Sequence, residues 1–279
     1  MAHDEIVVSV CIPVYNCALF IGEAIKSVLD QSFRQYELLI IDNKSTDGTL
    51  AVIKKFNDPR IRLIENDRNI GQAGNWDKCL LEARGMYIKL LPADDFIYPD
   101  CLKRQVGIFE DPKYPDVVLI CCARDIIDEK GRKILTRRFG SCEGAINGVE
   151  AVRKTIRSGG NLIGEPGATL FKKEILDRTG RFPGYRDCVG DLELWSKILL
   201  NGSLYVFSES LCVFRISGVS SSSQILASQH REDFKNFIDK LYFKKEFQLT
   251  ISDVLVGKFR ATINSYARRI IYFALLRGK

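Results

Sequence analysis

The sequence IVVSVCIPVYNCALFIGEAIKSVLDQSFRQYELLIIDN (residues 6–43) decides the fold. Residues 6–15 form an apolar, β-branched run with the length of a buried strand. Residues 19–31 follow with apolar side chains at helical spacing, and residues 36–43 form a second apolar run. Neither run alternates cleanly between apolar and polar residues, which is typical of parallel strands that helices cover on both faces. We therefore expect an α/β protein with a mostly parallel sheet.

The same alternation continues along the chain to about residue 123. Strands are predicted at 60–66, 86–95 and 116–123, with helices at 46–57, 71–85 and 99–111. Ser45 or Thr46 is the expected cap of the helix at 46–57, and Gly85 is expected near the end of the next helix. Residues 128–133 (DEKGRK) indicate a hairpin turn. Beyond residue 140 the pattern is less regular, with strands predicted at 169–172 and 204–217 and a helix that contains 191–202.

The length of 279 residues suits one large domain or a domain with an appendage. Hydrophobic residues make up 46% of the chain and charged residues 27%, as in an ordinary globular protein. We predict a main domain over 1–216, with a nucleotide-binding half (1–123) and an acceptor half (124–216). Residues 217–279 are then a hinge followed by a basic helical extension.

The charge of the chain is concentrated at its C-terminal end. The net charge is +6, from 41 basic and 35 acidic residues. From residue 257 to 279 there is no acid, and six residues are basic: Lys258, Arg260, Arg268, Arg269, Arg277 and Lys279. The rest of the chain is therefore neutral, which argues against nucleic acid as a partner.

Cysteine and histidine usage gives no sign of a zinc site. The nine cysteines are scattered without a CxxC pair, and only His3 and His230 are available to join them. Several cysteines lie in apolar runs, so we expect reduced, buried thiols and a cytoplasmic location. The N-terminal residues pass directly into a strand pattern, and no apolar stretch reaches the roughly 20 residues that cross a bilayer.

Polar side chains stand where three predicted strands end. These are Tyr15 with Asn16, Asp42 with Asn43, and Asp94 with Asp95. Ligands of open α/β sheets bind beyond the carboxyl ends of the strands, so the three pairs predict a site. The adjacent carboxylates of Asp94 and Asp95 repel each other unless a metal ion, a basic side chain or water compensates. Neither a GxGxxG motif nor a Walker A loop is present.

Four motifs resemble those of family 2 glycosyltransferases with the GT-A fold. They are VSVCIPVYN (8–16), LLIIDNKSTDGT (38–49), NIGQAGNWDKCLLEARGMYIKLLPADD (69–95) and GDLELWSKI (190–198). The resemblance covers about residues 6–216. It implies an inverting enzyme that takes a sugar from a nucleotide-diphosphate donor, with Mn²⁺ or Mg²⁺ as the cofactor. It also implies a saccharide or lipid-linked saccharide acceptor in glycan biosynthesis.

The resemblance assigns five residues to the nucleotide. Asp42 reads the base, and because a carboxylate accepts the N3–H of uracil, it favours a UDP-linked donor. Tyr15 is expected to stack on the base, and Pro13, in the same motif, is also expected to lie at the nucleotide-sugar site. Asn69 and Asn75 open a helix at whose start a diphosphate is favoured. The alternatives are a turn-starting role for Asp42, packing for Tyr15 and ordinary helix capping for Asn69.

The resemblance assigns the cation to the acidic pair. Asp95 is expected to bind the divalent metal that bridges the two phosphates, and Asp94 to lie near the ribose. Pro92 replaces the first acid of the family's DxD-type motif. Arg215 is expected to supply positive charge near the donor, because Ser217 stands where relatives carry a histidine. The alternative is that the two acids are only a solvated helix cap.

Asp191 falls where the family carries its general base. A single inverting displacement needs one carboxylate to take the proton of the acceptor hydroxyl. Asp187 and Glu193 are rivals for this role, and a helix-capping Asp191 is the non-catalytic alternative. Glu165, in a glycine-rich loop, is a candidate to hold an acceptor hydroxyl. Trp195 and Trp76 are expected to pack in the interior and not to bind the sugar.

Two other functions and one further partner remain open. A nucleotidyltransferase would carry a basic glycine-rich loop after the first strand, and residues 13–22 (PVYNCALFIG) have no Lys or Arg. A degenerate nucleotide-binding module would keep the fold without catalysis. The basic and apolar tail at 256–279 either packs on the body or lies on the inner face of an anionic membrane as a peripheral contact.

Overall fold

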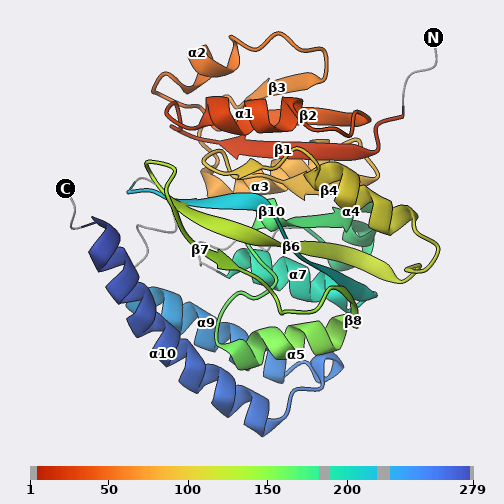
Figure 1. The fold of residues 1–279 in the computed structure, drawn as a ribbon, viewed down its shortest axis with the longest axis vertical. Coiled ribbons are helices and arrows are strands. Elements are labelled where there is room, and N and C mark those ends of the chain that lie inside the picture. The colour runs from red at the N-terminus through yellow and green to blue at the C-terminus, as the bar shows by residue number, and fades with distance from the viewer. Residues whose placement is uncertain (1–4, 182–188, 219–226, 277–279) are drawn as a thin grey trace.

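The structure is a computed structural model that describes residues 5–181, 189–218 and 227–276. A ten-stranded sheet forms its centre, with the strand order β3-β2-β1-β4-β9-β6-β10-β5, and with β7 paired to β6 and β8 paired to β10 (Figure 1). Helices lie on both faces of this sheet. The predicted α/β architecture with a central sheet flanked by helices is confirmed.

The N-terminal half forms the parallel part of the sheet, as predicted. Its strands are β1 (Val8–Val14), β2 (Tyr36–Asp42), β3 (Ile61–Glu65) and β4 (Tyr87–Leu90), and these four strands are parallel to one another. The connecting helices are α1 (Ile21–Leu29), α2 (Thr49–Ile53) and α3 (Gly71–Glu82). Every residue of β1 and β2 is buried, which explains why their sequences do not alternate.

The later strands join the sheet in both directions. β6 (Val117–Asp128) and β10 (Ser203–Ile216) are parallel to each other, whereas β9 (Thr169–Lys172) lies antiparallel between β4 and β6. Three short strands pair antiparallel with β6 or β10: β5 (Phe96–Ile97), β7 (Lys133–Arg137) and β8 (Gly144–Asn147). The hairpin predicted at 128–133 joins β6 to β7, with Gly131 at a positive φ of 78°.

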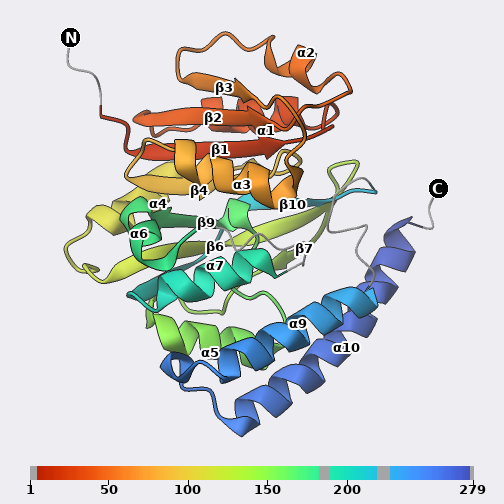
Figure 2. The same cartoon turned by 180° about the vertical axis from the view of Figure 1, so that it is seen from behind.

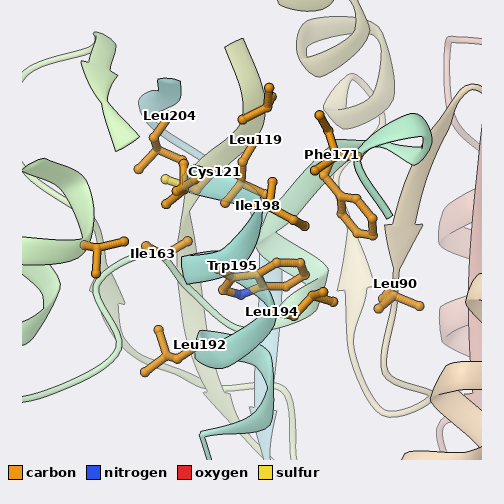
Figure 3. Packing of buried hydrophobic residues seen from close by; sticks show 14 of the residues in the cluster. Leu90, Leu119, Cys121, Ile163, Phe171, Leu192, Leu194, Trp195, Ile198 and Leu204 are labelled. Atoms are coloured by element: carbon orange, nitrogen blue, oxygen red, sulfur yellow. The ribbon is translucent and has the colours of Figure 1, made fainter. Parts of the chain in front are cut away.

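Two hydrophobic cores lie on opposite faces of the sheet. One face is covered by α1, α2 and α4 (Cys101–Glu110); the other by α3, α5 (Gly148–Ser158), α7 (Gly190–Leu199) and α9 (Ala227–Tyr242) (Figure 2). Trp195 is fully buried in the second core, where its ring lies 5.5 Å from that of Phe171 (Figure 3). The predicted packing role of Trp195 is therefore confirmed.

Two predicted helix boundaries are wrong. The N-cap of α2 is Gly48, not Ser45 or Thr46, and it makes no side-chain capping hydrogen bond; the Oδ1 of the preceding residue, Asp47, accepts a hydrogen bond from the N–H of Thr49 at 2.9 Å. Gly85 does not cap α3, which ends at Glu82. A glycine is required there because a Cβ at residue 85 would lie 2.5 Å from the backbone nitrogen of Ser9 in β1.

The C-terminal part of the chain is helical, as predicted. After α9, the helix α10 (Ile251–Leu276) packs against α9 and α5. The described residues also include the short helix α6 (Leu176–Thr179) and three 3₁₀ turns, of which η1 (Pro166–Ala168) lies near the site. Within the described ranges, no helix has the length and apolarity needed to cross a bilayer. Most of the predicted hinge, residues 219–226, lies outside those ranges.

All eight cysteines in the described ranges are free thiols. Six of them are buried: Cys11, Cys79, Cys101, Cys121, Cys122 and Cys212. Burial raises the pKa of the Cys17 thiol to about 12, and the negative charges of Asp94, Asp47 and Asp95 add to this. Cys17 therefore lies close to the acidic pair that follows β4.

Candidate active site

The loops that follow β1 and β2 are joined by hydrogen bonds. The N–H of Asn16 donates to Ser45 Oγ at 3.0 Å, and the N–H of Thr46 donates to Asn16 Oδ1 at 2.8 Å. Asn16 has a positive φ of 50°, a conformation that Asn tolerates better than most residues. The carboxyl ends of these two strands therefore form one rigid edge, on the side of the molecule where the β1 arrow ends (Figure 1).

Asp42 ends β2 with one carboxylate oxygen satisfied and one without a partner. Its Oδ2 accepts a hydrogen bond from the N–H of Ser45 at 3.0 Å. Its Oδ1 is buried and has no hydrogen-bond partner among the described residues. Such an oxygen is costly unless a donor arrives. Tyr15 lies at the end of the neighbouring β1 with 47% of its surface exposed, while Pro13 is buried within β1 opposite Ile41.

The two asparagines predicted near the diphosphate are used in an amide network. Asn75 is buried; it donates to the carbonyl of Ile41 at 3.0 Å and accepts from Asn66 at 3.0 Å. Asn69 Oδ1 accepts from Asn43 and from the N–H of Gly71. Both side chains fix the start of α3 beside the end of β2. Direct contact of either residue with a donor remains a prediction.

Asp94 and Asp95 follow β4 and differ in their surroundings. Asp95 is buried, and its Oδ1 accepts a hydrogen bond from the N–H of Arg215 at 2.9 Å. Burial raises the pKa of the Asp95 carboxyl well above its usual value, and the charge of Asp94 raises it further. Burial likewise raises the pKa of Asp94, which retains some exposure. Two adjacent carboxylates that resist ionisation are suited to a cation that arrives with its ligand.

The guanidinium of Arg215 holds in place the loop that carries Asp94 and Asp95. Its Nε donates to the backbone carbonyl of Asp94 at 3.0 Å, and its Nη2 forms an ion pair with Glu23 of α1. The guanidinium carbon lies 4.7 Å from the ring centre of Phe20 and 5.9 Å from that of Phe96. Arg215 is therefore buried among protein partners, and a direct contact with the donor remains a prediction.

The described residues contain no group of three or more His, Cys, Asp or Glu side chains able to hold a metal. A divalent ion at Asp95, with Asp94 beside it, would therefore need further oxygen ligands. The phosphates of a nucleotide donor are ligands of the required hard type. The residues present fit a metal that binds together with its substrate, and not a metal held by protein alone.

Glu165 and the buried Arg124 form an ion pair near the loop that carries Asp94 and Asp95, which we call the acidic loop. Arg124 Nε lies 2.5 Å from Glu165 Oε2, and the other Arg124 nitrogens donate to the carbonyls of Asn161 and Leu162. Burial opposes the ionisation of Glu165, but the charge of Arg124 holds the pKa of Glu165 below its usual value. Glu165 therefore stays negatively charged, with Arg137 as a second, more distant cation at 3.7 Å.

Asp191 lies near the start of α7 beside this ion pair. Its Oδ2 accepts a hydrogen bond from Asn161 Nδ2 at 3.0 Å, and its Oδ1 accepts from the N–H of Leu192 at 2.8 Å. Burial raises the pKa of Asp191 to about 7, and the charge of Glu165 contributes to this rise, whereas Arg124 opposes it. A pKa near neutrality is what a general base needs.

One of the two alternative candidates for the general base, Glu193, is engaged in an ion pair. Glu193 is buried, and both of its carboxylate oxygens bind Lys240 of α9, at 2.6 and 2.7 Å. That ion pair connects α7 to α9 and leaves Glu193 unsuited to take a proton from a substrate. Asp187, the other rival, lies outside the described residues.

The charge of Glu165 acts on both the acidic loop and Asp191. Its negative charge raises the pKa of both Asp95 and Asp191, so both carboxyls lie near it. The turn η1 that follows Glu165 packs under the acidic loop, since a Cβ at Gly167 would lie 3.8 Å from Asp95 Oδ2. Asp95, Glu165 and Asp191, which come from three separate segments, therefore form one candidate site.

Three residues of this site were not predicted: Glu23, Arg124 and Asn161. Arg124 follows the apolar run VVLICCA within the same strand, β6. A charged residue in a buried strand is a signal that could have indicated its role. Asn161 lies in a glycine-rich loop, and Glu23 lies on α1, where a solvated acid is the ordinary interpretation. Their roles depend on contacts between distant segments.

Comparison with known proteins identifies relatives of this chain in sequence and in fold. The UDP-Glc:alpha-D-GlcNAc-diphosphoundecaprenol beta-1,3-glucosyltransferase WfgD of Escherichia coli is 35% identical over 105 residues, which cover 38% of this chain and 42% of that enzyme. Among solved structures, S. aureus TarS in complex with UDP-GlcNAc superposes with a TM-score of 0.65 at 20% identity, over 84% of this chain and 66% of that chain.

A second solved structure has the same fold. The mannosyltransferase PcManGT from Pyrobaculum calidifontis, in complex with GDP-Man and Mn²⁺, gives a TM-score of 0.59 at 21% identity over 93% of this chain and 75% of that chain. These likenesses establish the GT-A fold. A family model described as glycosyl transferase family 2 matches residues 9–180, which is more than half of the sequence. The chain therefore belongs to glycosyl transferase family 2.

Proposed function

We propose that the protein is an inverting glycosyltransferase that moves a sugar from a UDP-linked donor to a hydroxyl of a saccharide or lipid-linked saccharide in glycan biosynthesis. The observation that carries this proposal is the group Asp95, Glu165 and Asp191. In this group an acidic pair suited to a cation and a carboxyl with a pKa of about 7 both lie near one charged residue, Glu165, which supports the proposal. Leaving-group stabilisation and proton removal require these two elements at one centre.

The end of β2 supports a uridine donor. The unpaired Oδ1 of Asp42 is a hydrogen-bond acceptor without a donor, and the N3–H of uracil would satisfy it. Cytosine offers a lone pair at N3, which the carboxylate repels. The exposed ring of Tyr15 is available to stack on the base. The name of WfgD also specifies a UDP-linked donor and a lipid-linked acceptor, which is consistent with this assignment.

Asp95, with Asp94 beside it, is proposed to hold Mn²⁺ or Mg²⁺ together with the donor phosphates. When bound, such an ion supplies positive charge that stabilises the departing diphosphate. The protein's own part is to keep Asp95 buried and oriented through the backbone N–H of Arg215. Arg215, by its contacts to Glu23 and to the Asp94 carbonyl, keeps the acidic loop in position.

Asp191 is proposed to act as the general base. Its carboxylate takes the proton of the acceptor hydroxyl while that oxygen bonds to the anomeric carbon of the sugar. The bond from that carbon to the phosphate oxygen breaks at the same time, and the nucleoside diphosphate leaves with the electron pair. The hydrogen bond from Asn161 orients the carboxylate, and Glu165 makes it basic enough to accept a proton near neutral pH.

The proposal is tested by measuring sugar transfer and donor hydrolysis with a panel of UDP-, GDP- and CDP-sugars, with Mn²⁺ and with EDTA. We expect metal-dependent turnover with a UDP-sugar and weaker binding of every CDP-sugar. Asp42→Asn should reduce the discrimination between uridine and cytidine, because an amide both donates and accepts hydrogen bonds. Donor binding without hydrolysis or transfer under any condition would instead identify a non-catalytic nucleotide-binding module.

We also propose a cytoplasmic location with peripheral contact to the inner face of the membrane. A lipid-linked acceptor would require the active site to approach a bilayer. The basic composition of residues 257–279 supports such a contact.

A further inference from the structure

The outward face of α10 carries a continuous row of apolar side chains. Large fractions of their surfaces are exposed: 66% for Ile251, 64% for Leu255, 68% for Phe259, 51% for Ile263 and 58% for Tyr266. Successive residues of a helix turn by about 100°, so these five project within about 120° of one another. We call these five residues the outer face of α10. A soluble helix normally has its polar side chains in this position.

The opposite face of α10 is fixed to the body, so the helix cannot rotate to bury its outer face. Asp253 pairs with Arg157 of α5 at 2.7 Å. At the crossing with α5 the backbones touch: a Cβ at Gly257 would lie 2.6 Å from the carbonyl oxygen of Ile156. Similarly, a Cβ at Gly159 would lie 2.3 Å from the backbone nitrogen of Ala261. The apolar row is therefore a permanent surface of the folded protein.

Basic residues border the outer face. Lys258 lies at one edge of it, where it also pairs with Asp239, and Arg260 lies beyond the other edge, where it donates to the carbonyl of Arg157. After Asp253 the sequence contains no acidic residue, and six basic residues fall between 257 and 279. An exposed apolar row with cations beside it matches an anionic lipid interface, where apolar side chains enter the acyl boundary and cations meet the headgroups.

The same charges disfavour a second copy as the occupant. A symmetric dimer through α10 would bring two such tails together, each with six basic residues and no acid between 257 and 279. An anionic bilayer is attracted by that charge instead. We propose that the outer face of α10 lies on an anionic phospholipid surface, with the helix axis in the plane of the interface.

This placement would bring the active site to the lipid. In both views the C-terminal end of α10 lies on the side of the molecule where β1 and β10 end, which is the side of the acidic loop (Figures 1 and 2). A lipid-linked acceptor would then reach Asp191 from the bilayer. That consequence depends on the proposed function, whereas the lipid contact does not and is tested without any sugar donor.

The test is flotation of the full-length protein with vesicles of equal parts phosphatidylglycerol and phosphatidylcholine, and with phosphatidylcholine alone. Wild type should float with the anionic vesicles and much less with the neutral ones. Leu255→Asp combined with Phe259→Asp should reduce binding per lipid by at least about tenfold, since it removes two apolar groups and adds two negative charges. The matched control is Leu81→Asp, the same change at a side chain of α3 that is 55% exposed, which should float like wild type.

Circular dichroism checks that the double variant is folded, and Phe259→Ser provides a milder variant that should show a smaller loss of binding. The proposal is overturned if wild type does not float with anionic vesicles, or if the folded double variant floats as well as wild type. Light scattering tests the alternative that a second copy of the chain covers the outer face of α10. A wild-type dimer that the double variant converts to monomers, without flotation of either protein, would assign the outer face to a contact between copies.

Discussion

Replacing Glu165 with Gln removes one negative charge beside Asp191 while keeping the size of the side chain. Glu165 is one cause of the raised pKa of Asp191, and Arg124 acts in the opposite direction. In Glu165→Gln, the charge of Arg124 is no longer neutralised by its partner at 2.5 Å. Both effects lower the pKa of Asp191. The acid limb of the pH profile of kcat/KM should therefore move to lower pH in the variant.

The size of the effect follows from the pKa of about 7, against the usual value of 3.8. For wild type, Asp191 is ionised in about one-tenth of molecules at pH ~6 and in about nine-tenths at pH ~8, so kcat/KM should rise about tenfold between them. If the whole shift were lost, the ratio would be about 1. The variant should fall between these limits, with a lower plateau as well, because a weaker base removes the proton less effectively.

The assay is kcat/KM for sugar transfer across the pH range at constant ionic strength, with the donor well below KM. Saturation with Mn²⁺ is verified at each pH, because the pKa values of Asp94 and Asp95 are also raised. Arg137→Gln is the matched control: it removes a more exposed partner of Glu165 at 3.7 Å and leaves the Glu165 charge in place, so its acid limb should coincide with that of wild type. An acid limb that does not move in Glu165→Gln would refute the electrostatic role of Glu165 or the assignment of Asp191 as the base.

Three further variants probe other parts of the structure. Asp191→Asn should reduce transfer by about 10²–10⁴-fold while the Kd for UDP stays within about twofold, measured by steady-state kinetics and calorimetry; normal turnover would remove the base assignment. The raised pKa of Asp191 stabilises the folded protein at low pH, and this stabilisation is lost as the pH rises through about 7. Between pH ~5 and pH ~8, the free energy of unfolding of Asp191→Asn, measured in urea, should therefore rise by about 2–3 kcal/mol relative to that of wild type. A difference that does not change with pH would contradict that pKa. Asp95→Asn should raise the Kd for UDP at least about tenfold in Mn²⁺ and leave it unchanged in EDTA, since it removes a metal ligand; equal effects in both would argue against the metal. Gly159→Ala should destabilise the protein by about 1–3 kcal/mol, because residue 159 has a φ of 72° and a Cβ there would meet the backbone of Ala261, whereas Gly140→Ala, with no atom within 4 Å, should not; equal stability of the two would contradict the close packing of α5 and α10.

The strand and helix alternation of the N-terminal half could be predicted because each element there has a strong local signal. β1 and β2 are mostly apolar and buried throughout, and α1 shows a clear helical period. α5 was missed although Asn147 caps its start and Gly159 follows its end, because the glycine-rich and polar sequence around it lacks the alternation used for the first half. The position of β9 between β4 and β6 depends on pairing between distant segments, which local periodicity does not encode.

In the candidate site, too, some residues could be predicted from local sequence and others could not. Asp42 and Asp95 were predicted because they stand at strand ends, a position that the sequence reveals directly. The pairing of Arg124 with Glu165 and the hydrogen bond from Asn161 to Asp191 were not, because each joins segments about 30 to 40 residues apart that meet only in the folded sheet. The structure also gave Glu193 a partner, Lys240, that no local pattern indicates.

The insertion of β9 between β4 and β6 also constrains how the chain folds during synthesis. Until Thr169–Lys172 leaves the ribosome, β4 has β1 on one side and an open edge on the other. Open edges of apolar strands are sites of aggregation, and closing this one requires a contact between residues far apart in the chain. A nascent chain that stops short of residue 169 therefore exposes an unpaired strand edge to other chains, and β4 is protected on both sides only after β9 has been made.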